Sequence, residues 1–346
     1  MHDECTLLAQ NSEETRSIGG SLAHTLYAIP TTVAFTGELG AGKTTFIQGF
    51  ASALGVREPL SSPTYALEQR YAGSSAAFLH LDLYRLNPAQ ADDLIRSSDD
   101  FPGIRAIEWS ERLDNKRLTG NTSLVRVHLE EGVSRDERVI RCTFEDGRLF
   151  GDAQLNAWRQ EAMIPGHILD HCEAVARLTD QLADELINGG KIVRRQALRC
   201  AARIHDLFRF LDFRPGGHPD NTHSAKHVSR WAQWRAQFPA MHHEKACAEF
   251  LRREGYPVIA DIVETHGLTL GPPERRRMEQ QLLFYADKRV MMDKVVSLEE
   301  RFADFAARYG NGVVTEKNAF WYQEAKKVEQ ELFRSSTAPT APSALP

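Results

Sequence analysis

Residues 32–45 read TVAFTGELGAGKTT, and this stretch decides the fold of the first half of the chain. Its β-branched, apolar beginning indicates a buried strand. The segment Gly37–Thr45 then fits the pattern G-x-x-x-x-G-K-[ST], and a helix is expected to start at Lys43. A strand, a glycine-rich loop and a helix in this order predict a phosphate-binding loop, or P-loop.

The loop would bind a nucleotide mainly through its backbone. Glycines let successive N–H groups converge on a triphosphate, and the start of the helix adds a favourable dipole. Lys43 would act in catalysis by reaching the β- and γ-phosphates of ATP, and the Thr44 hydroxyl would bind Mg²⁺. The nucleotide-binding residues predicted here are Gly37, Glu38, Leu39, Gly40, Ala41, Gly42, Lys43, Thr44 and Thr45.

Two acidic residues end later apolar strands and are candidates for a second Mg²⁺ partner. Asp82 closes the run FLHLD (78–82), which is the Walker-B layout, and Glu108 closes the run IRAIE (104–108). Either carboxylate could orient Mg²⁺ or the attacking water, and for each the simpler alternative is an acid that faces solvent. The polar turn SPTY (62–65) either senses the γ-phosphate or is only a turn.

Strands and helices alternate through the rest of this half. Asn11, followed by Glu14, is expected to cap a helix that runs to about Tyr27, and a further helix follows Pro88. The expected strands cover residues 32–36, 65–71, 77–82, 104–108, 124–129 and 139–144. Such alternation after a glycine-rich loop predicts an α/β sheet domain.

The sequence pattern changes near residues 145–147. From there to residue 333 the apolar residues recur at helical spacing, which predicts an all-α second half. The tail is rich in Ser, Thr, Ala and Pro and is expected to be disordered. We therefore place an α/β P-loop domain at residues 1–148, a helical domain at 149–334 and a disordered tail at 335–346.

Histidines and aspartates on the expected helices form a second candidate site. His171 opens an amphipathic helix, and His205-Asp206 falls within the apolar run AARIHDLF. Such a pair is costly to bury unless something binds it, and Asp287 is a further acid within an apolar run. Imidazole and carboxylate ligands suit divalent Mn, Fe, Co, Ni or Zn without selecting among them.

Three alternatives remain open for these histidines. His167 and His171 are four residues apart and can form a metal-binding pair by themselves. His242, rather than its neighbour His243, can be a ligand. The helical half can also be a fold that holds no metal.

Composition and charge limit the classes of function. Residues 1–150 hold 15 Lys and Arg against 21 Asp and Glu, and this negative balance makes direct binding of a polyanion unfavourable. Any function on nucleic acid is therefore expected to require partner proteins. No run approaches the roughly 20 apolar residues of a membrane helix, and the first residues lack the layout of a signal peptide. The five scattered cysteines favour reduced thiols. We expect a cytoplasmic protein with no membrane partner.

Four motifs carry a resemblance to a known family: GELGAGKTT (37–45), SPTY (62–65), DLYRL (82–86) and EW (108–109). In this order they resemble the TsaE family, the bacterial ATPases of tRNA threonylcarbamoyladenosine biosynthesis, over about residues 5–145. The resemblance implies an ATPase that works with two sugar-kinase-like subunits and a carbamoyl-adenylate synthase. Through that complex it would act on tRNA indirectly, at the adenosine beside the anticodon of tRNAs that read ANN codons.

The resemblance to TsaE also implies roles for single residues. Thr44 and Glu108 would be Mg²⁺ ligands, and Asp82 a ligand or the base that orients water. Thr15 would lie near the adenine. One position departs from the pattern, because the family usually has Pro after Glu-Trp and this chain has Ser110. That change leaves the carboxylate in place but can alter the turn that aims it.

The order H…HD…D, with two further histidines in between, resembles the HD superfamily of metal-dependent phosphohydrolases over about residues 160–310. The resemblance implies two metals, with Asp206 bridging them and acting in catalysis. The ligands would be His171, His205, Asp206 and Asp287 for the first metal, and His243 and His266 with Asp206 for the second. Lys288 or Arg289 would steady the departing phosphate.

The chain is thus interpreted as a TsaE-like P-loop ATPase fused to an HD-type phosphohydrolase. Two other interpretations remain. The helical half can be a non-catalytic nucleotide sensor that regulates the ATPase, or the P-loop half can be a small-molecule kinase. The motifs at 62–65 and 108–109 argue against a kinase, and no lid insertion is obvious.

Overall fold

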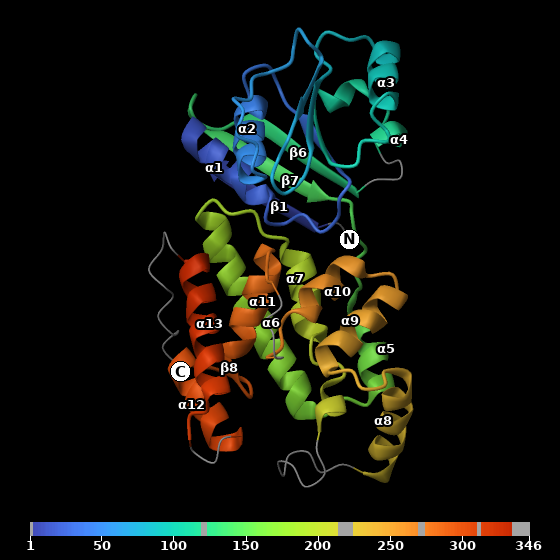
Figure 1. The fold of residues 1–346 in the computed structure, drawn as a ribbon, viewed down its shortest axis with the longest axis vertical. Helices are drawn as coiled ribbons and strands as arrows, with labels where there is room; N and C mark the ends of the chain where they lie inside the picture. Colours follow the sequence, from blue (N-terminus) through green and yellow to red (C-terminus); the bar gives the residue numbers. More distant parts are fainter. Residues whose placement is uncertain (1–2, 119–122, 214–223, 269–273, 310–312, 334–346) are drawn as a thin grey trace. The chain divides into compact units, whose positions relative to one another are not determined.

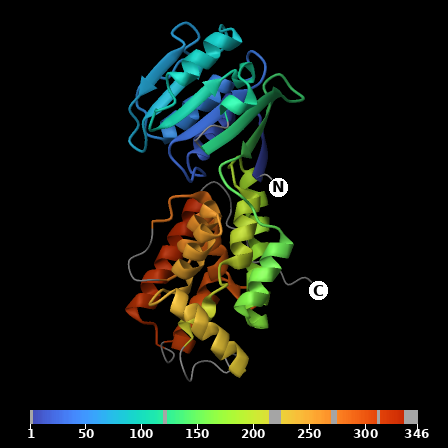
Figure 2. The same ribbon diagram turned by 90° about the vertical axis from the view of Figure 1, so that its right-hand side faces the viewer.

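The computed structural model describes residues 3–118, 123–213, 224–268, 274–309 and 313–333, which form two compact units (Figures 1 and 2). The first unit comprises Met1–Gly147 with Leu186–Arg194, and the second comprises Arg148–Glu185 with Arg195–Pro346. The predicted fold class is confirmed, since an α/β unit is followed by a helical one. The domain boundary at residues 148/149 stays a prediction, and the tail predicted to be disordered lies outside the described residues.

The first unit is built on a seven-stranded sheet with the strand order β1-β7-β6-β2-β5-β4-β3. The strands β6, β2, β5 and β4 are parallel, while β7, β1 and β3 are antiparallel to their neighbours. The elements of this unit, coloured blue to green in Figure 1, are β1 (Asp3–Ala9), α1 (Ser12–Leu22), β2 (Thr31–Thr36), α2 (Lys43–Ala53), β3 (Glu68–Tyr71), β4 (Phe78–Asp82), α3 (Pro88–Arg96), β5 (Ile104–Glu108), η1 (Ser110–Arg112), α4 (Asn115–Leu118), β6 (Ser123–Glu131) and β7 (Arg138–Phe144).

Alternating side chains bury one hydrophobic core on each face of this sheet. Val33 and Phe35 of β2 lie in the core that α1 and α2 cover, and Ala34 between them lies in the core that α3 covers. A Cβ added to Gly19 of α1 or Gly49 of α2 would come within 2.1 or 1.8 Å of a backbone oxygen of the facing helix. Glycine at both positions therefore lets α1 pack directly against the helix that starts at the P-loop.

Three elements differ from the expectation. Helix α1 has the predicted Asn11 cap but ends at Leu22 rather than near Tyr27. Just after this end, the Thr25 hydroxyl donates a hydrogen bond to Leu22 O. Only Glu68–Tyr71 of the strand expected from residue 65 pairs as β3. Strand β1 was missed, although its residues alternate between buried and exposed, because its partner β7 lies more than a hundred residues away in the sequence.

The segment Leu186–Arg194 completes the first unit. Ile192 lies in the core beneath α1, and its N–H donates to Ser21 Oγ at 2.9 Å. The buried guanidinium of Arg194 makes two hydrogen bonds to the Asp146 carboxylate, at 2.6 and 2.9 Å, and lies 3.3 Å from Asp3 Oδ2. Residues that follow the helical α6 in sequence are therefore part of the α/β core.

The described part of the second unit is helical apart from the small β8–β9 hairpin. In the part of the chain that the structure describes, no helix has both the length and the apolar character needed to cross a bilayer. The elements are α5 (Asp152–Ala162), α6 (Gly166–Asn188), α7 (Arg195–Ile204), η2 (Arg209–Asp212), α8 (Ala225–Gln237), α9 (His243–Arg253), α10 (Pro257–Glu264), α11 (Met278–Lys288), β8 (Val290–Met291), β9 (Lys294–Val295), α12 (Leu298–Tyr309) and α13 (Glu316–Leu332).

Candidate nucleotide site and candidate metal centre

The predicted P-loop connects β2 to the first turn of α2. Gly37, Gly40 and Gly42 have φ values of 133°, 84° and 96°, in the region that favours glycine. A Cβ at Gly37 would lie 2.1 Å from Leu129 O, so a larger residue does not fit there. The nine predicted nucleotide-binding residues thus form one loop and the start of one helix, where N–H groups have no partner within the helix.

Lys43 is folded back onto this loop and is buried. Its Nζ donates to Gly37 O at 2.6 Å and to Glu38 O at 3.0 Å, and it lies 3.8 Å from the centroid of the Trp109 ring. Burial lowers the pKa of the ammonium, and the nearby Glu108 carboxylate opposes that shift. The ammonium is therefore held against the loop by uncharged backbone carbonyls, which a charged phosphate could replace.

The structure brings Thr44 and Glu108 together. Thr44 Oγ1 donates to Glu108 Oε1 at 2.8 Å, and the same oxygen lies 2.9 Å from Nε2 of His80, a fully buried residue of β4. The His80 Nδ1 atom makes no hydrogen bond to the described residues. Sequence analysis missed His80, because the sequence of β4 does not show that this side chain contacts Glu108 on the neighbouring β5. Glu108 is thus fixed by a hydroxyl of α2 and an imidazole of β4.

Asp82 lies beside Glu108, because β4 and β5 are paired in parallel register at their ends. Its Oδ2 accepts hydrogen bonds from Ser62 Oγ at 3.0 Å and Thr64 Oγ1 at 2.6 Å, and its Oδ1 accepts one from Tyr84 N at 2.9 Å. Asp82 and Glu108 are both buried. Neither acid simply faces solvent, and the polar turn at 62–65 is attached to the Asp82 carboxylate.

Two further residues lie against the P-loop. Thr15 of α1 is buried, and its Cγ2 lies 3.5 Å from the position that a Cβ of Gly42 would take. Arg138 of β7, which was not predicted, donates from Nε to Ala41 O and from Nη2 to Gly40 O, each at 3.1 Å. A guanidinium therefore supports the outer carbonyls of the loop, a role that no sequence motif indicates.

Ser110, at the position where the resembling family usually has Pro, anchors the turn after β5. Its Oγ donates to Phe35 O of β2 at 3.1 Å, and the side chain is buried. The preceding residue, Trp109, has a φ of 61°, in the left-handed region. The hydroxyl thus fastens the turn that follows Glu108 to the neighbouring strand.

The predicted metal ligands of the second unit converge from five helices. His171 lies on α6, His205 and Asp206 follow the end of α7, and His243 begins α9. His266 follows the end of α10, and Asp287 lies on α11. All six side chains are buried. The packing of the helices, rather than any local motif, therefore assembles this cluster.

The Nε2 atoms of the four imidazoles face two carboxylates. His171 Nε2 lies 3.0 Å from Asp287 Oδ1, and His205 Nε2 lies 3.8 Å from both Asp287 Oδ1 and Asp206 Oδ2. His243 Nε2 lies 3.0 Å from Asp206 Oδ1 and 3.1 Å from His266 Nε2. His266 Nε2 is itself 3.6 Å from Asp206 Oδ1. Asp206 is the central member of the cluster.

The Nδ1 atom of each ring contacts an acceptor outside the cluster. These acceptors are Met292 O for His171 (3.0 Å), Ala202 O for His205 (2.8 Å), Val263 O for His266 (2.6 Å) and Asp212 Oδ2 for His243 (2.5 Å). A carbonyl oxygen only accepts, so the Nδ1 atoms that face carbonyls carry protons and their Nε2 lone pairs face inward. His205 Nε2 is buried with no hydrogen-bond partner among the described residues. Inward lone pairs with outer acceptors are the arrangement of metal-binding histidines, so these residues fit a metal.

The charges of the two carboxylates suit a cation, and a bound metal would displace the second proton of the His243 ring. Burial lowers the pKa of His205 to about 4, which keeps that ring neutral near pH 7. Burial would lower the pKa of His243 as well, but Asp206 and Asp212 on its two sides outweigh it and raise the pKa to about 9. The pKa of Asp206 and that of Asp287 stay well below their usual value in spite of burial, because imidazoles and a lysine surround them. The two carboxylates are therefore ionised.

Lys288 and Arg289, the residues expected near a departing phosphate, are both buried. Lys288 Nζ bonds the Asp287 carboxylate and donates to His266 O at 3.2 Å. Arg289 Nε donates to Val296 O at 2.6 Å. Lys288 thus lies against the cluster, whereas Arg289 supports the chain after the β8–β9 hairpin.

The alternatives left open for the histidines stay predictions, but the grouping of ligand atoms in the structure bears on them. Among the described residues, three groups of at least three His and carboxylate residues have ligand atoms within 4.8 Å of one another: His171-His205-Asp287, His205-Asp206-His266 and Asp212-His243-Glu244. Neither His167 nor His242 belongs to any of them, and the His242 side chain is 67% exposed. Sequence analysis missed Asp212 and Glu244. Asp212 lies between the apolar Leu211 and Phe213, and its contact with His243 forms only when η2 packs against α9.

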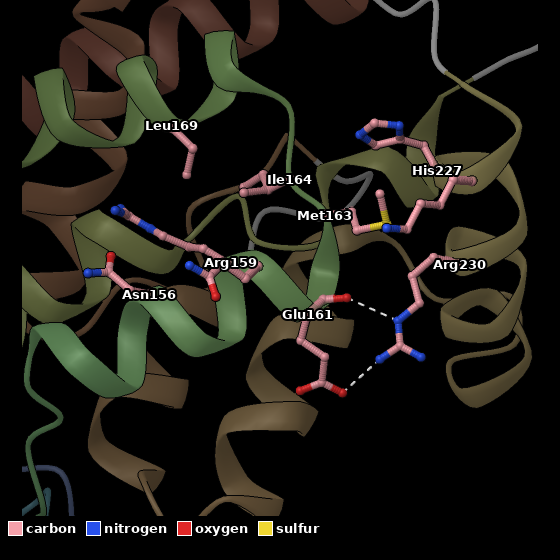
Figure 3. Close-up of a pocket in the computed structure, with 10 residues that line it drawn as sticks. Asn156, Arg159, Glu161, Met163, Ile164, Leu169, His227 and Arg230 are labelled. Atoms are coloured by element: carbon pink, nitrogen blue, oxygen red, sulfur yellow. Dashed lines mark hydrogen bonds and ion pairs between the residues drawn. The ribbon is translucent and has the colours of Figure 1, made fainter.

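A separate cavity of about 730 Å³ lies between α5, α6 and α8 (Figure 3). Arg230 of α8 lines the cavity and donates hydrogen bonds to Glu161 O at 3.0 Å and to Glu161 Oε1 at 2.8 Å. No residue of the His/Asp cluster lines this cavity. The cavity is therefore distinct from the candidate metal centre.

Comparison with known proteins agrees with both resemblances. A family model described as "Threonylcarbamoyl adenosine biosynthesis protein TsaE" matches residues 9–140, and one described as "HD domain" matches residues 168–292. The "tRNA threonylcarbamoyladenosine biosynthesis protein TsaE" of Nostoc sp. (strain PCC 7120) is 36% identical over 141 residues, which cover 39% of this chain and 86% of that protein. The protein of the same name from Aquifex aeolicus is 33% identical over 131 residues, which cover 35% of this chain and 94% of that one.

A solved structure, that of Bacillus subtilis YdiB, aligns with 42% of this chain and 87% of its own, with 26% identity and a TM-score of 0.33. The sequence matches and the geometry of the two sites together identify both parts of the molecule. The chain belongs to the TsaE family through its first unit, and its residues 168–292 are an HD domain.

Proposed function

We propose that the first unit hydrolyses ATP with Mg²⁺ in support of threonylcarbamoyladenosine formation on tRNA, in the cytoplasm and together with the other proteins of that machinery. Membership of the TsaE family supports the proposal. The observation that carries the ATPase assignment is the contact of 2.8 Å between Thr44 and Glu108 at the start of α2. A hydroxyl after the P-loop lysine and a carboxylate at a strand end are the groups that hold Mg²⁺ in P-loop enzymes.

Each residue of this site has a separate task in the proposal. Lys43 would exchange the carbonyls of Gly37 and Glu38 for the β- and γ-phosphates, while N–H groups of the loop and of α2 bind the remaining oxygens. Bound Mg²⁺ would neutralise phosphate charge, held by Thr44 and Glu108. Asp82 would orient water, and its bonds to the turn at 62–65 would let that turn respond to the nucleotide.

Partner dependence is the direct test of this part. The acidic balance of residues 1–150 makes tight binding of tRNA unfavourable, so we expect slow ATP turnover by the chain alone and stimulation by the other proteins of the machinery. Turnover is measured as phosphate release with and without those proteins. Tight, salt-sensitive tRNA binding by the chain alone, with turnover that no partner changes, would contradict the proposal.

For the second unit we propose a metal-dependent phosphohydrolase acting on a nucleotide or another phosphoester. The observation that carries it is the convergence of four Nε2 atoms on Asp206 and Asp287. His171, His205, Asp206 and Asp287 would hold one divalent metal, and His243 and His266, with Asp206, a second. Mn, Fe, Co, Ni or Zn at these positions would supply Lewis acidity to a phosphoryl group. Asp206 would link the two positions, and the buried rings would keep the ligands oriented.

The test uses the intact chain, because the second unit is interrupted by Leu186–Arg194, which belongs to the first. A Lys43→Met variant removes the background ATPase. That variant is loaded with each metal and screened against nucleotides and simple phosphoesters, with Lys43→Met/Asp206→Ala as the control. Cleavage that needs Asp206 supports the proposal. Binding of a nucleotide without cleavage would make the unit a sensor, and transfer of phosphate from ATP to a small molecule by the wild-type chain would favour a kinase.

A further inference from the structure

Asp212 touches the cluster but lies outside the set of predicted metal ligands. It ends the short helix η2, its side chain is 24% exposed, and its Oδ2 lies 2.5 Å from His243 Nδ1. Its other oxygen, Oδ1, lies 3.2 Å from Nδ1 of the exposed His242. Asp212 therefore contacts His243 on the side of the ring that faces away from Asp206.

His243 differs from the other three imidazoles in the charge of its outer acceptor. The other rings direct Nδ1 at backbone carbonyls, whereas His243 directs it at a carboxylate. A second carboxylate oxygen, Glu244 Oε2, lies 3.4 Å from the same Nδ1. It is buried and has no hydrogen-bond partner among the described residues. Two acids thus face Nδ1 of this ring.

Arg209 lies close to the same atoms but cannot replace Asp212. Its Nη1 lies 3.1 Å from His243 Nδ1 and 3.5 Å from Asp212 Oδ2. A guanidinium only donates hydrogen bonds, so it cannot accept a proton from Nδ1. Its charge instead supports the ionised form of Asp212 beside it.

A carboxylate on Nδ1 has two consequences for a metal-binding histidine. It keeps the proton on Nδ1 and so fixes the ring with the Nε2 lone pair directed at the metal, and it makes the ring a stronger donor. In this molecule Nε2 of the same ring lies 3.0 Å from Asp206 Oδ1 and 3.1 Å from His266 Nε2. The effect of Asp212 is therefore directed at one part of the cluster.

We propose that Asp212 is the positioning residue of the second metal position, the one formed by Asp206, His243 and His266. It orients His243 and thereby sets the metal affinity of that position, without acting on the position that His171 and Asp287 line. This inference rests on the proposed function of the second unit.

The test measures metal binding rather than activity. The intact wild-type chain and the Asp212→Asn variant are dialysed against a series of free Mn²⁺ concentrations, and bound metal is counted per chain. We expect two equivalents in the wild type, and in the variant a dissociation constant for one equivalent raised by about 10–100-fold, with the other unchanged. The matched control is His242→Gln, which removes the imidazole that contacts Asp212 Oδ1 and should leave both equivalents as in the wild type.

The outcomes separate this inference from the proposed function. A wild-type chain that binds no metal contradicts the proposed function itself. A wild type with two equivalents and an Asp212→Asn variant with the same two affinities overturns only the role of Asp212. Equal weakening of both equivalents also overturns it, because Asp212 would then support the fold as a whole.

A second measurement applies if Asp212→Asn fails to fold. In the zinc-loaded wild type labelled with ¹⁵N-histidine, the His243 ring, assigned through His243→Gln, should show a proton on Nδ1 in a strong hydrogen bond. A His243 ring that carries its proton on Nε2 would overturn the proposal.

Discussion

The two candidate sites of this chain are held together in different ways. The nucleotide site is made mostly by backbone groups of nine consecutive residues, Gly37–Thr45, between a strand and a helix. The metal centre is made by side chains from His171 to Asp287, 116 positions apart, which lie on five helices or within two residues of their ends. The geometry of the first site is thus a property of the local sequence, whereas that of the second depends on how the helices pack. Substitutions should affect the two sites independently, and to different degrees.

The largest effect is expected from Asp206→Ala. Asp206 lies within 3.0–3.8 Å of the Nε2 atoms of His243, His266 and His205, so its loss disturbs both metal positions. Removing an outer partner of a ligand costs about 10–100-fold in metal affinity, and losing a direct ligand should cost more than about 100-fold. Metal counted per chain and ATP binding by the same sample are the measurements. Loss of ATP binding together with metal would contradict the independence of the two sites.

The matching change at the nucleotide site is Lys43→Met. Met keeps the apolar stem of this buried side chain and removes the ammonium that would reach the phosphates. We expect ATP turnover to fall by more than about 100-fold, by analogy with the loss of other charge-stabilising groups in active sites, while the metal content stays unchanged. Phosphate release measures the ATP turnover, and metal analysis measures the metal content. ATP turnover near the wild-type rate would mean that the P-loop assignment is wrong.

A structural effect of intermediate size is expected from Arg194→Met. The substitution leaves Asp3 and Asp146 as buried carboxylates without their common cation, which costs about 3–5 kcal/mol. Hydrogen exchange should accelerate in β1 and β7, which carry or flank these acids. The matched control is Arg195→Met, whose side chain is 37% exposed and pairs with surface acids, so it should cost no more than about 1 kcal/mol. Equal exchange in the two variants would show that Arg194 does not hold the sheet.

The smallest effect is expected from His80→Gln. His80 fixes the Glu108 carboxylate through Nε2, so its loss should raise the Mg²⁺ concentration for half-maximal ATP turnover by about 10-fold and leave metal-free nucleotide binding unchanged. His128→Gln is the control, since His128 lies on β6, which β2 and β5 separate from β4, and it bonds Thr36 rather than Glu108. An identical Mg²⁺ dependence in the two variants would remove His80 from the site.

Sequence analysis predicted two kinds of feature in this molecule. A local pattern specified the strand, loop and helix around Lys43, and the resemblance to the HD superfamily named the six His and Asp residues of the cluster. His80, Arg138 and Asp212 could not, because each acts through a contact made only after strands or helices pack. The carbonyl of Met292 that orients His171 is a backbone group, and backbone acceptors leave no trace in residue types.

The central claim is that four imidazole Nε2 atoms and two carboxylates form a centre for divalent metal in the second unit. The most direct measurement is anomalous X-ray scattering from crystals of the intact chain soaked in Mn²⁺, recorded at a wavelength where manganese scatters anomalously. We predict two peaks within the cluster, one beside His171 and Asp287 and one beside His243 and His266, both close to Asp206. Crystals with no anomalous peak in the cluster after soaking with Mn²⁺, and likewise with Fe²⁺, Co²⁺, Ni²⁺ and Zn²⁺, would contradict the claim.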